Sequence, residues 1–372
     1  MHILLTNAME TTSGGGINKT IREVGTNLVR QGHEVTVLQT NPMNLPNEEI
    51  CSGFKIIRIK SRLGEFIHNL SPEMYLYLKA SFKRLSPDVV HMHDYGTLLT
   101  SELMFFLRRE KCPVVLSPHY GPESHDTYSG KYLWNIYNKL IGRHSFEFAD
   151  KIICASQFEG ECIQRAFGVK NDKIAIIPHG IDPVQTLGAD TSNNERISLL
   201  YYGWLIELKG VQHILTALGE LERKFHRDAQ LSIIGQGRYE STLVQLANEL
   251  GIESSISWYP FLFGEELYKK IRKADMSLLI SRSENFGIQV AEVLAMGIPC
   301  IVAKTTALVE FLDEPGCFGI DYPPNSTELA ELIINIKDRN PKVGPLSDRI
   351  RTWDKVVDDY ERVYVSLLSA SE

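Results

Sequence analysis

The chain has 372 residues, of which 43% are hydrophobic and 23% charged, so it is long enough for two globular domains with separate cores. Its net charge of −7 argues against a protein dedicated to nucleic acid. No apolar run approaches the ~20 residues that span a bilayer, the first residues lack the basic start of a signal peptide, and the six cysteines lack metal-site spacing, so we expect a cytoplasmic protein with reduced thiols.

In the first half of the chain, strand-like and helix-like segments alternate, which favours a parallel sheet with helices on its faces. A glycine loop, Gly14-Gly15-Gly16, follows the first strand and precedes a helix expected at residues 18–30. Such a loop lets backbone N–H groups approach an anion, although many glycine loops are only turns. The strands of this half are expected at residues 3–6, 34–38, 55–59, 89–91, 114–117, 151–154 and 175–177.

The second half repeats this alternation after a polar, aperiodic stretch at residues 182–196, which is the best candidate for a linker. We therefore expect an α/β protein with two doubly wound domains at residues 1–185 and 186–345, and a C-terminal helix within 346–372 that could pack back on the first domain. Strands are expected at residues 198–202, 231–234, 256–259, 276–281 and 299–303, and helices at 210–224, 239–250, 265–273, 288–296 and 347–368.

Two carboxylates, Glu284 and Glu292, lie in a loop and in the helix that follows it, which Gly297 is expected to end. The start of this helix offers unpaired backbone N–H groups, which suit a phosphate. Two acids eight residues apart can accept hydrogen bonds from hydroxyl groups at two places of an elongated ligand. A phosphate between two sets of sugar hydroxyls indicates a nucleotide sugar. The alternative is that Glu284 only ends a strand and Glu292 lies on a solvated helix face.

Residues 283–299 resemble the E-x7-E region of glycosyltransferase family 4, whose members are retaining sugar transferases of the GT-B fold. The resemblance extends over nearly the whole chain and includes the glycine loop, the segment at 203–210 and the G-x-G at 235–237. It implies two Rossmann-like doubly wound domains that face a central cleft. In such a protein the N-terminal domain is the acceptor side and the C-terminal domain binds the nucleotide-sugar donor.

The resemblance also implies roles for individual residues. Glu284 would contact hydroxyl groups of the transferred sugar, and Glu292 would contact the ribose. Lys209 would neutralise the diphosphate, although a lysine before a helix is by default a solvated surface residue. His119 would meet the transferred sugar, although a histidine at a strand end is more often a turn residue. The catalytic set is thus Glu284, His119 and Lys209, and the donor-binding set is Gly15, Gly16, Lys209, Gly235, Gly237, Phe261, Leu262, Asn285, Phe286, Gly287 and Glu292.

Two of the departures from the family pattern concern the donor site. Asn285 stands where a glycine is usual, and Trp204 stands where an arginine usually joins the lysine at the diphosphate. An indole has one neutral N–H in place of a charged guanidinium fork, so another cation would have to replace it. Arg238 and Arg282 are the nearest candidates by motif position.

His91 and His93 alternate along an expected strand and therefore share a face, which gives them the look of a metal site. The family, however, transfers sugars without a bound metal and commonly carries a similar run of residues here. We therefore expect no metal and no cofactor, and a structural or acceptor-side role for the two histidines.

The sequence thus predicts a metal-independent, retaining hexosyl- or N-acetylhexosaminyltransferase of glycan or glycoconjugate biosynthesis. It would move a sugar from a nucleoside-diphosphate donor to an acceptor hydroxyl by front-face displacement. The alternatives are a GT-B nucleotide-sugar epimerase, a sugar phosphorylase or a non-catalytic nucleotide-sugar-binding subunit. The residues do not identify the base, the sugar, the acceptor or the linkage.

A basic stretch with interleaved aromatic residues at 54–85 motivates a second hypothesis about partners. It holds seven cations against Glu65 and Glu73, and this excess predicts contact with an anionic membrane at the inner face of the cell membrane, where the acceptor would be lipid-linked. The alternative is an ordinary solvated face. The cations are Lys55, Arg58, Lys60, Arg62, Lys79, Lys83 and Arg84.

Overall fold

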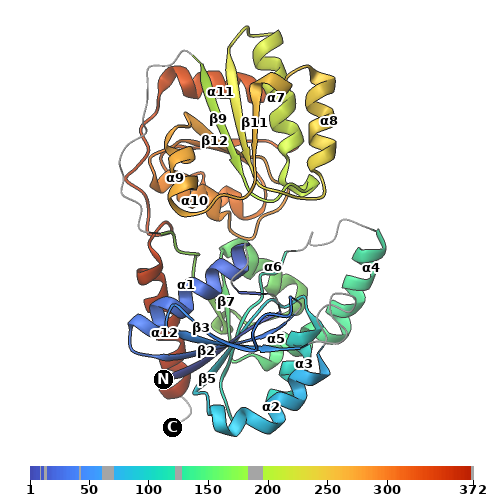
Figure 1. Ribbon diagram of the computed structural model, residues 1–372, viewed down its shortest axis with the longest axis vertical. Coiled ribbons are helices and arrows are strands. Elements are labelled where there is room, and N and C mark those ends of the chain that lie inside the picture. The colour runs from blue at the N-terminus through green and yellow to red at the C-terminus, as the bar shows by residue number, and fades with distance from the viewer. Residues whose placement is uncertain are drawn as a thin grey trace. The chain divides into compact units, whose positions relative to one another are not determined.

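Two sheets, each with helices on both faces, form the framework of the computed structural model (Figure 1). The structure describes residues 1–8, 10–11, 15–41, 43–60, 71–121, 128–182 and 196–369, so most of the expected linker lies outside the described residues. The chain forms two compact units: unit 1 is Met1–Gly180 with Arg351–Glu372, and unit 2 is Ile181–Ile350. The assignment of acceptor and donor domains to residues 1–185 and 186–345 stays a prediction.

The sheet of unit 1 has the order β3-β4-β2-β1-β5-β6-β7-β8, in which only β3 runs antiparallel to its neighbour. Each predicted strand of this half is confirmed within two residues at either end. The sequence did not predict β3, because its exposed residues Glu48, Glu49 and Ile50 lack the alternation of a half-buried strand. The strands are β1 His2–Asn7, β2 Glu34–Thr40, β3 Glu48–Cys51, β4 Phe54–Ile59, β5 Val89–His93, β6 Val114–Ser117, β7 Lys151–Cys154 and β8 Ile174–Ile176.

The C-terminal helix α12 packs on α1 within unit 1. The side chain of Gln31, at the end of α1, donates to Asp358 over 2.7 Å, and the His33 ring lies 2.9 Å from the Glu361 carboxylate. Trp353, Val356, Tyr360 and Tyr364 on α12 are buried, which explains why this last helix belongs to the first unit. The helices of unit 1 are α1 Gly16–Arg30, α2 Pro72–Leu85, α3 Leu98–Leu107, α4 Tyr128–Tyr137, α5 Arg143–Phe148, α6 Gln157–Phe167 and α12 Trp353–Ser369.

One of the cations that the sequence placed on a basic surface is buried. The Arg58 side chain on β4 is fully buried, and its Nε and Nη2 atoms donate to Glu10 over 2.8 and 3.0 Å. Glu10 is itself buried and also accepts from the Gln39 side chain over 2.6 Å. The interpretation of Arg58 as a surface cation was therefore wrong, because a charge can be buried when it is paired and hydrogen-bonded.

The sheet of unit 2 is wholly parallel, with the order β11-β10-β9-β12-β13-β14. Counted within the unit this is 3-2-1-4-5-6, the order of dinucleotide-binding sheets. Strands 2 and 3 are added on one side of strand 1 and strands 4 to 6 on the other, so the strand order switches between the first and fourth strands. Ligands bind such sheets beyond the carboxyl ends of their strands at that point, here beside β9 and β12. The strands are β9 Ile197–Tyr202, β10 Ala229–Ile234, β11 Ile256–Tyr259, β12 Met276–Leu279, β13 Cys300–Ala303 and β14 Cys317–Ile320.

The helices of unit 2 start and stop largely where the sequence indicates. Helix α10 ends as predicted at Gly297, whose φ of +79° allows its N–H to bond Leu294 while Ile298 bonds Val293. Helix α11 was not predicted from the sequence, although Asn325 caps it by accepting from the N–H groups of residues 327 and 328. The α-helices are α7 Val211–Arg223, α8 Glu240–Leu250, α9 Gly264–Arg272, α10 Ile288–Ala295 and α11 Ser326–Arg339.

Candidate functional site

The switch point of the unit 2 sheet brings together two residues that the sequence singled out. Lys209 follows β9 in the short 3-10 helix Glu207–Lys209, and Glu284 follows β12. The Lys209 ammonium donates to Glu284 Oε1 over 2.6 Å, with 20% and 12% of the two side chains exposed. The cation assigned to the diphosphate and the carboxylate assigned to the sugar thus form a partly buried ion pair.

Backbone contacts hold these two loops in place. Gly210 has a φ of +71°, and a Cβ at this position would overlap the carbonyl oxygen of Ile280, so the turn after Lys209 requires glycine. The Arg282 N–H donates to the carbonyl of Leu208 over 2.9 Å. On the other side, the Glu284 N–H donates to the Thr306 hydroxyl over 2.9 Å. The loop that carries Glu284 is therefore fixed by the segments after β9 and β13.

Glu292 is buried within the unit and does not lie on a solvated helix face. It sits on α10 with 5% of its surface exposed, and its Oε2 accepts a hydrogen bond from the Tyr202 hydroxyl over 2.7 Å. Burial and the neighbouring charge of Glu292 raise the pKa of Tyr202 well above its usual range, so the phenol remains a donor. Tyr202 ends β9 and holds the carboxylate at the same edge of the sheet.

The G-x-G sequence after β10 lies against the end of β9. Gly235 has a φ of +149°, and a Cβ on it would overlap the carbonyl oxygen of Gly203. A Cβ on Gly237 would likewise overlap the carbonyl of Leu205, whose N–H donates to Gln236 over 2.9 Å. Both glycines therefore permit close approach of two backbone loops, which is a structural requirement independent of any ligand.

Three aromatic side chains gather after β9 and β11. The Trp204 ring is 45% exposed and meets Phe261 edge to face at 4.9 Å, and Phe261 stacks on Phe263 at 6.3 Å. Phe261 and its neighbour Leu262 are half-buried. The position where the family has an arginine thus presents an apolar ring, and Arg282 and Arg238 lie in the adjoining loops.

Residues 285–287 connect Glu284 to the start of α10, and each has a different environment. Asn285 is half-buried, whereas the Phe286 side chain is buried against Phe311 at 5.2 Å between ring centres. Gly287 caps the helix with a φ of +96° and no side-chain cap bond. Phe286 can therefore serve a ligand only through its backbone, because its ring is part of the core.

In unit 1, the loop after β1 leads into α1 with glycines at its start. Gly15 is the N-terminal cap, with a φ of +119° and no side-chain cap bond, and Gly16 is the first helical residue. Gly14 lies outside the described residues. The first-turn N–H groups of α1 are consistent with an anion site at this end of the helix.

Four imidazole rings, two on β5, one after β6 and one after β8, follow one another. The rings of His91 and His93 are 4.3 Å apart, those of His93 and His119 are 5.5 Å apart, and those of His119 and His179 are 5.9 Å apart. His93 Nδ1 lies 3.2 Å from His119 Nε2, and His179 Nδ1 lies 3.3 Å from the hydroxyl of Thr20 on α1. We call these four residues the imidazole row.

All four histidines are neutral at physiological pH. Burial lowers the pKa of His91 to about 3 and that of His179 to about 4. Burial and the neighbouring rings hold the pKa of His93 and of His119 well below the usual range. The row therefore provides hydrogen-bond donors and acceptors without net charge.

A buried carboxylate fixes the loop that carries His119. Glu159, at the start of α6, accepts from the N–H of Tyr120 over 2.7 Å and from the N–H of Ala155 over 2.8 Å. Burial raises its pKa to about 7, and these two hydrogen bonds oppose the rise. His119 itself has a φ of +50°, a conformation that is strained for a side-chain-bearing residue and that this anchoring supports.

Some classes of site have no counterpart in the part of the chain that the structure describes. There, no three His, Cys, Asp or Glu side chains are grouped to hold a metal ion. No helix among the described residues is long and apolar enough to cross a membrane. All six cysteines are free thiols.

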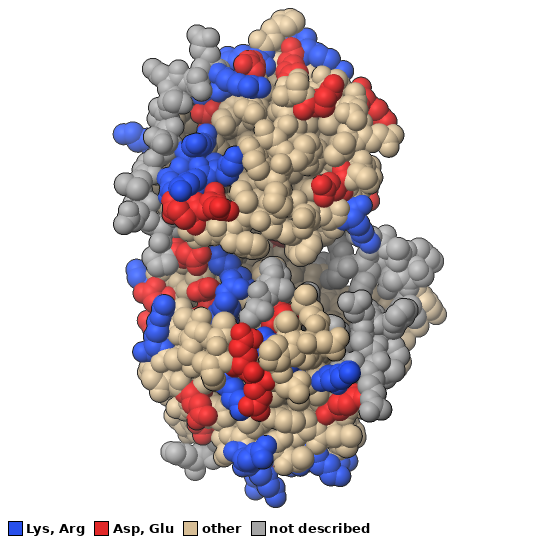
Figure 2. All heavy atoms as spheres, in the orientation of Figure 1, with Lys and Arg blue, Asp and Glu red and all other residues tan. Residues whose placement is uncertain are grey.

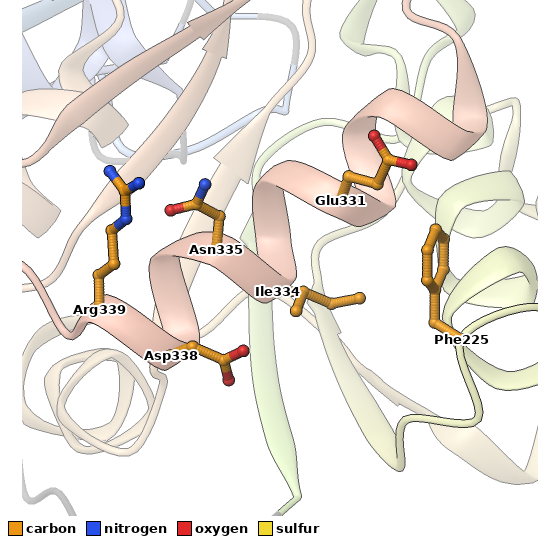
Figure 3. A pocket seen from close by; sticks show the side chains of 6 residues that line it. All are labelled: Phe225, Glu331, Ile334, Asn335, Asp338 and Arg339. Carbon is orange, nitrogen blue, oxygen red and sulfur yellow. The ribbon is translucent and has the colours of Figure 1, made fainter.

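A surface hollow of about 390 Å³ lies away from these residues, between α11 and the segment after α7 (Figure 3). Asn335 and Arg339 project from α11 along its rim, and Ile334 faces the ring of Phe225 across it. None of the residues singled out by the sequence lines this hollow. The candidate site is therefore the sheet edge, and not the hollow.

Comparison with known proteins bears on the whole chain. Residues 14–185 match the model of Glycosyltransferase Family 4, and residues 188–352 match that of Glycosyl transferases group 1. The chain belongs to glycosyltransferase family 4. This family 4 protein is accordingly a glycosyltransferase, and the family resemblance inferred from residues 283–299 is confirmed.

Individual relatives of this family 4 chain are distant in sequence. An uncharacterized glycosyltransferase of Methanocaldococcus jannaschii is 26% identical over 341 residues, which cover 85% of this chain and 83% of that one. The structure is similar to that of a sucrose-phosphate synthase from Thermosynechococcus elongatus (TM-score 0.80, 18% identity, 99% of each chain). It is also similar to Anabaena HepE in complex with UDP-glucose (TM-score 0.68, 15% identity, 100% of this chain and 98% of that one). The fold is GT-B, with two Rossmann-like domains.

Sequence reasoning missed several residues that hold the candidate site together. Tyr202, Thr306 and Glu159 bond Glu292, the Glu284 loop and the His119 loop, respectively. Of these, Glu159 had a readable signal, because Ser156 stands three residues earlier in an S-x-x-E sequence and its hydroxyl accepts from the Glu159 N–H. Tyr202 and Thr306 come from strand ends remote in sequence, and no local pattern marks them.

Proposed function

We propose that this glycosyltransferase is a retaining enzyme that transfers a sugar from a nucleoside-diphosphate sugar to an acceptor hydroxyl. Unit 2 is the donor-binding part and unit 1 the acceptor side. The observation that carries the proposal is the Lys209–Glu284 ion pair at the switch point of the unit 2 sheet. A UDP-glucose complex is known for the structurally similar Anabaena protein, which supports a nucleotide-sugar donor here.

The charges in unit 2 suit the parts of such a donor. The Lys209 ammonium binds the diphosphate, Glu284 accepts hydrogen bonds from the transferred sugar, and Glu292 accepts from the ribose. The backbone at Gly235, Gly237 and residues 261–262 lines the base, and the N–H groups at residues 285–287 face the phosphates. Because phosphate oxygens compete with Glu284 for the ammonium, donor binding exchanges one ionic partner of Lys209 for another.

The reaction then needs no protein nucleophile. The bond from the anomeric carbon to the diphosphate oxygen breaks, and its electron pair goes to the diphosphate. The acceptor oxygen forms the new bond on the same face, and its proton passes to the departing diphosphate oxygen. Lys209 stabilises the negative charge that develops there, which is the largest contribution expected from a fixed charge in such a site.

Unit 1 supplies neutral groups to the same chemistry. We assign Gly15 and Gly16, at the start of α1, to the diphosphate and His119 to the transferred sugar. The lowered pKa of His119 supports a hydrogen-bonding role and argues against a cationic one. The reaction class is metal-independent on this proposal, with a hexosyl or N-acetylhexosaminyl group as the transferred sugar.

A donor screen tests the proposal. Thermal shifts with UDP, GDP and ADP identify the base, and turnover of the matching sugars is then measured over an acceptor panel. We expect a product with the anomeric configuration of the donor, measured by NMR. Inversion contradicts the retaining assignment. Conversion of donor without acceptor indicates an epimerase, dependence on inorganic phosphate indicates a phosphorylase, and binding without turnover indicates a non-catalytic subunit.

A second proposal concerns the membrane, and α2 and α3 carry the observation that favours it. Leu76 is 62% exposed and shares a face of α2 with the exposed Lys79 and Lys83. On α3, Phe105 is 55% exposed beneath the guanidinium of Arg109 at 5.3 Å. Lys and Arg side chains gather at the lower edge of Figure 2, where Figure 1 places α2. Apolar and cationic groups together suit an anionic membrane, where a lipid-linked acceptor would lie.

Vesicle co-sedimentation tests this contact. The variant Lys79→Glu/Lys83→Glu should lose binding to phosphatidylserine vesicles at low salt, because each cation near such a surface contributes about 1 kcal/mol. The matched control, Lys342→Glu/Lys355→Glu, makes the same charge change at exposed lysines on other segments. Equal loss in both variants, or no binding by the native protein, refutes the contact. Arg62 of the original basic stretch lies outside the described residues.

A further inference from the structure

One ring nitrogen of the imidazole row, Nε2 of His93, has surroundings that determine which nitrogen of that ring carries its proton. His93 is 1% exposed, and its Nδ1 is 3.2 Å from His119 Nε2. Among the residues that the structure describes, none offers a hydrogen-bond partner to the other nitrogen, His93 Nε2. A neutral imidazole has one N–H donor and one bare nitrogen acceptor, so the two ring positions of His93 are not equivalent.

The less costly arrangement places the single proton of His93 on Nδ1. A buried N–H without an acceptor forfeits a strong donor, and such orphaned N–H groups are rarer in proteins than acceptors that lack a donor. With the proton on Nδ1, His93 donates to His119 Nε2. Both rings are uncharged, because burial lowers the pKa of each. His119 Nε2 is then the acceptor, and the proton of His119 must lie on Nδ1.

We propose that His93 is a positioning residue that fixes His119 as the Nδ1–H tautomer, so that His119 acts toward the transferred sugar only as a hydrogen-bond donor. The sugar-binding role rests on the proposed function, whereas the tautomer does not. A sugar hydroxyl at His119 must then use its oxygen as the acceptor. Its own proton remains available to an acceptor such as a carboxylate, and the two contacts together orient the hydroxyl.

Contacts of His91 and Glu159 support the proposal that the tautomer of His119 is fixed. His91 is held on both sides, with Nδ1 at 2.7 Å from the Tyr364 hydroxyl and Nε2 at 2.9 Å from the Ser117 hydroxyl, so its ring gives His93 a fixed neighbour. Glu159 anchors the backbone directly after His119 through the Tyr120 N–H. The ring and the backbone of His119 are therefore both restrained, so its Nδ1–H bond points in one fixed direction.

The first test is NMR of the ligand-free protein with 15N-labelled histidine. Long-range proton–nitrogen correlations show which ring nitrogen carries the proton, and His119→Gln identifies the signals of His119. We expect His119 to be protonated at Nδ1 in the native protein. In His93→Leu, which removes the donor at similar size, the Nε2–H form should appear. In His93→Asn, whose amide nitrogen occupies the place of Nδ1, the Nδ1–H form should persist. Protonation of His119 at Nε2 in the native protein overturns the inference, even if neither variant folds.

Kinetics then separate the inference from the proposed function. His93→Leu should lower kcat about tenfold, the equivalent of one lost hydrogen bond, and His93→Asn should restore most of it. On a His119→Gln background, His93→Leu should have no further effect, because it acts through His119. If the NMR result holds and turnover is unchanged in His93→Leu, the tautomer stands and the role of His119 in the reaction fails.

Discussion

The two sheet edges carry opposite kinds of polar chemistry. The edge of unit 2 holds charged side chains, with the Lys209 ammonium paired to Glu284 and the Glu292 carboxylate accepting from the Tyr202 hydroxyl. The edge of unit 1 holds a row of neutral imidazoles with lowered pKa values. The first arrangement keeps charges available for exchange with a ligand, and the second avoids charge altogether.

This difference matches the two tasks of the proposed reaction, the binding of a diphosphate and the binding of a sugar. A diphosphate is recognised by fixed positive charge, and charge-assisted hydrogen bonds are about twice as strong as neutral ones. Sugar hydroxyls are neutral, and neutral donors and acceptors distinguish their orientation without attracting phosphate. The predictions below remove or add charge on each side to test that division.

The largest effect should follow Lys209→Ala. Loss of the ammonium leaves the charge on the departing diphosphate without its main partner, and turnover should fall by about 10²–10³-fold. Lys304→Ala, a lysine paired with Asp321 elsewhere in unit 2, is the matched control. Steady-state kinetics with the donor found in the screen provide the measurement. Near-normal turnover in Lys209→Ala would mean that the phosphates bind at another place.

Glu284→Ala should lower turnover about as much as Lys209→Ala does, but it should leave nucleoside-diphosphate binding intact. The residue is assigned to the sugar, and its removal also frees Lys209 from its ion pair. Calorimetry with the nucleoside diphosphate should therefore show equal or tighter binding. Weaker binding would contradict the assignment.

A pH experiment on Glu159 tests how the loop beside the imidazole row is held. Its pKa rises from 4.5 to about 7 on folding, which corresponds to about 3 kcal/mol of unfolding free energy. Below pH 4.5 the carboxyl is protonated in both states and this stability is fully present. As the pH rises toward 7 the unfolded chain ionises first, so the stability is lost. Relative to Glu159→Gln, the native protein should lose about 3 kcal/mol in urea unfolding between pH 4 and 8, whereas a constant difference would contradict the raised pKa.

Glu292→Ala should weaken binding of the nucleoside diphosphate itself by about tenfold, since it removes a hydrogen bond between a carboxylate and the ribose. Tyr202→Phe serves as the comparison, because it removes the phenol that holds Glu292 and leaves the carboxylate in place. We expect a smaller loss in Tyr202→Phe. Calorimetry on both variants measures the order, and the reverse order would show that Tyr202 is the direct contact.

The smallest effect is a gain. Trp204→Arg should tighten nucleoside-diphosphate binding by about three- to tenfold, because a guanidinium donates charge-assisted hydrogen bonds that the indole lacks. Trp204 is 45% exposed, so the exchange disturbs little packing apart from its contact with Phe261. Phe263→Arg places the same charge two residues beyond Phe261 and is the control. An equal gain in both variants would indicate general charge attraction.

Much of the fold could be predicted from the sequence, because the strands are short apolar runs bounded by glycine and proline. Residues 114–117, 151–154 and 256–259 are strands with the predicted bounds; the first lies between Pro113 and Pro118, and the last ends before Pro260. Elements without such a pattern were missed, among them the exposed β3. Buried charge also escaped, because Arg58 reads as a surface cation until Glu10 is found beside it.

The candidate site could likewise be predicted only in part. Residues in contiguous motifs, such as Glu284 and Lys209, could be named in advance, but not their ion pair, because it joins segments 75 residues apart. Likewise, the alternation of His91 and His93 indicated a shared face, whereas the link from His93 to His119 depends on the pairing of β5 with β6. Local spacing thus predicts chemistry, and sheet order decides which chemical groups meet.

The chain leaves unit 1 after Gly180 and re-enters it at Arg351, so unit 2 is a continuous insert and unit 1 is made of two pieces. Unit 2 is thus one contiguous segment, residues 181–350, whereas unit 1 needs the segments on both sides of it. Truncation of the last helix would also disturb the sheet of unit 1, because the Tyr364 hydroxyl forms a hydrogen bond with His91, which lies 273 positions earlier in the sequence. The last helix is in that sense a support of β5, so a deletion that removes Tyr364 acts on the imidazole row.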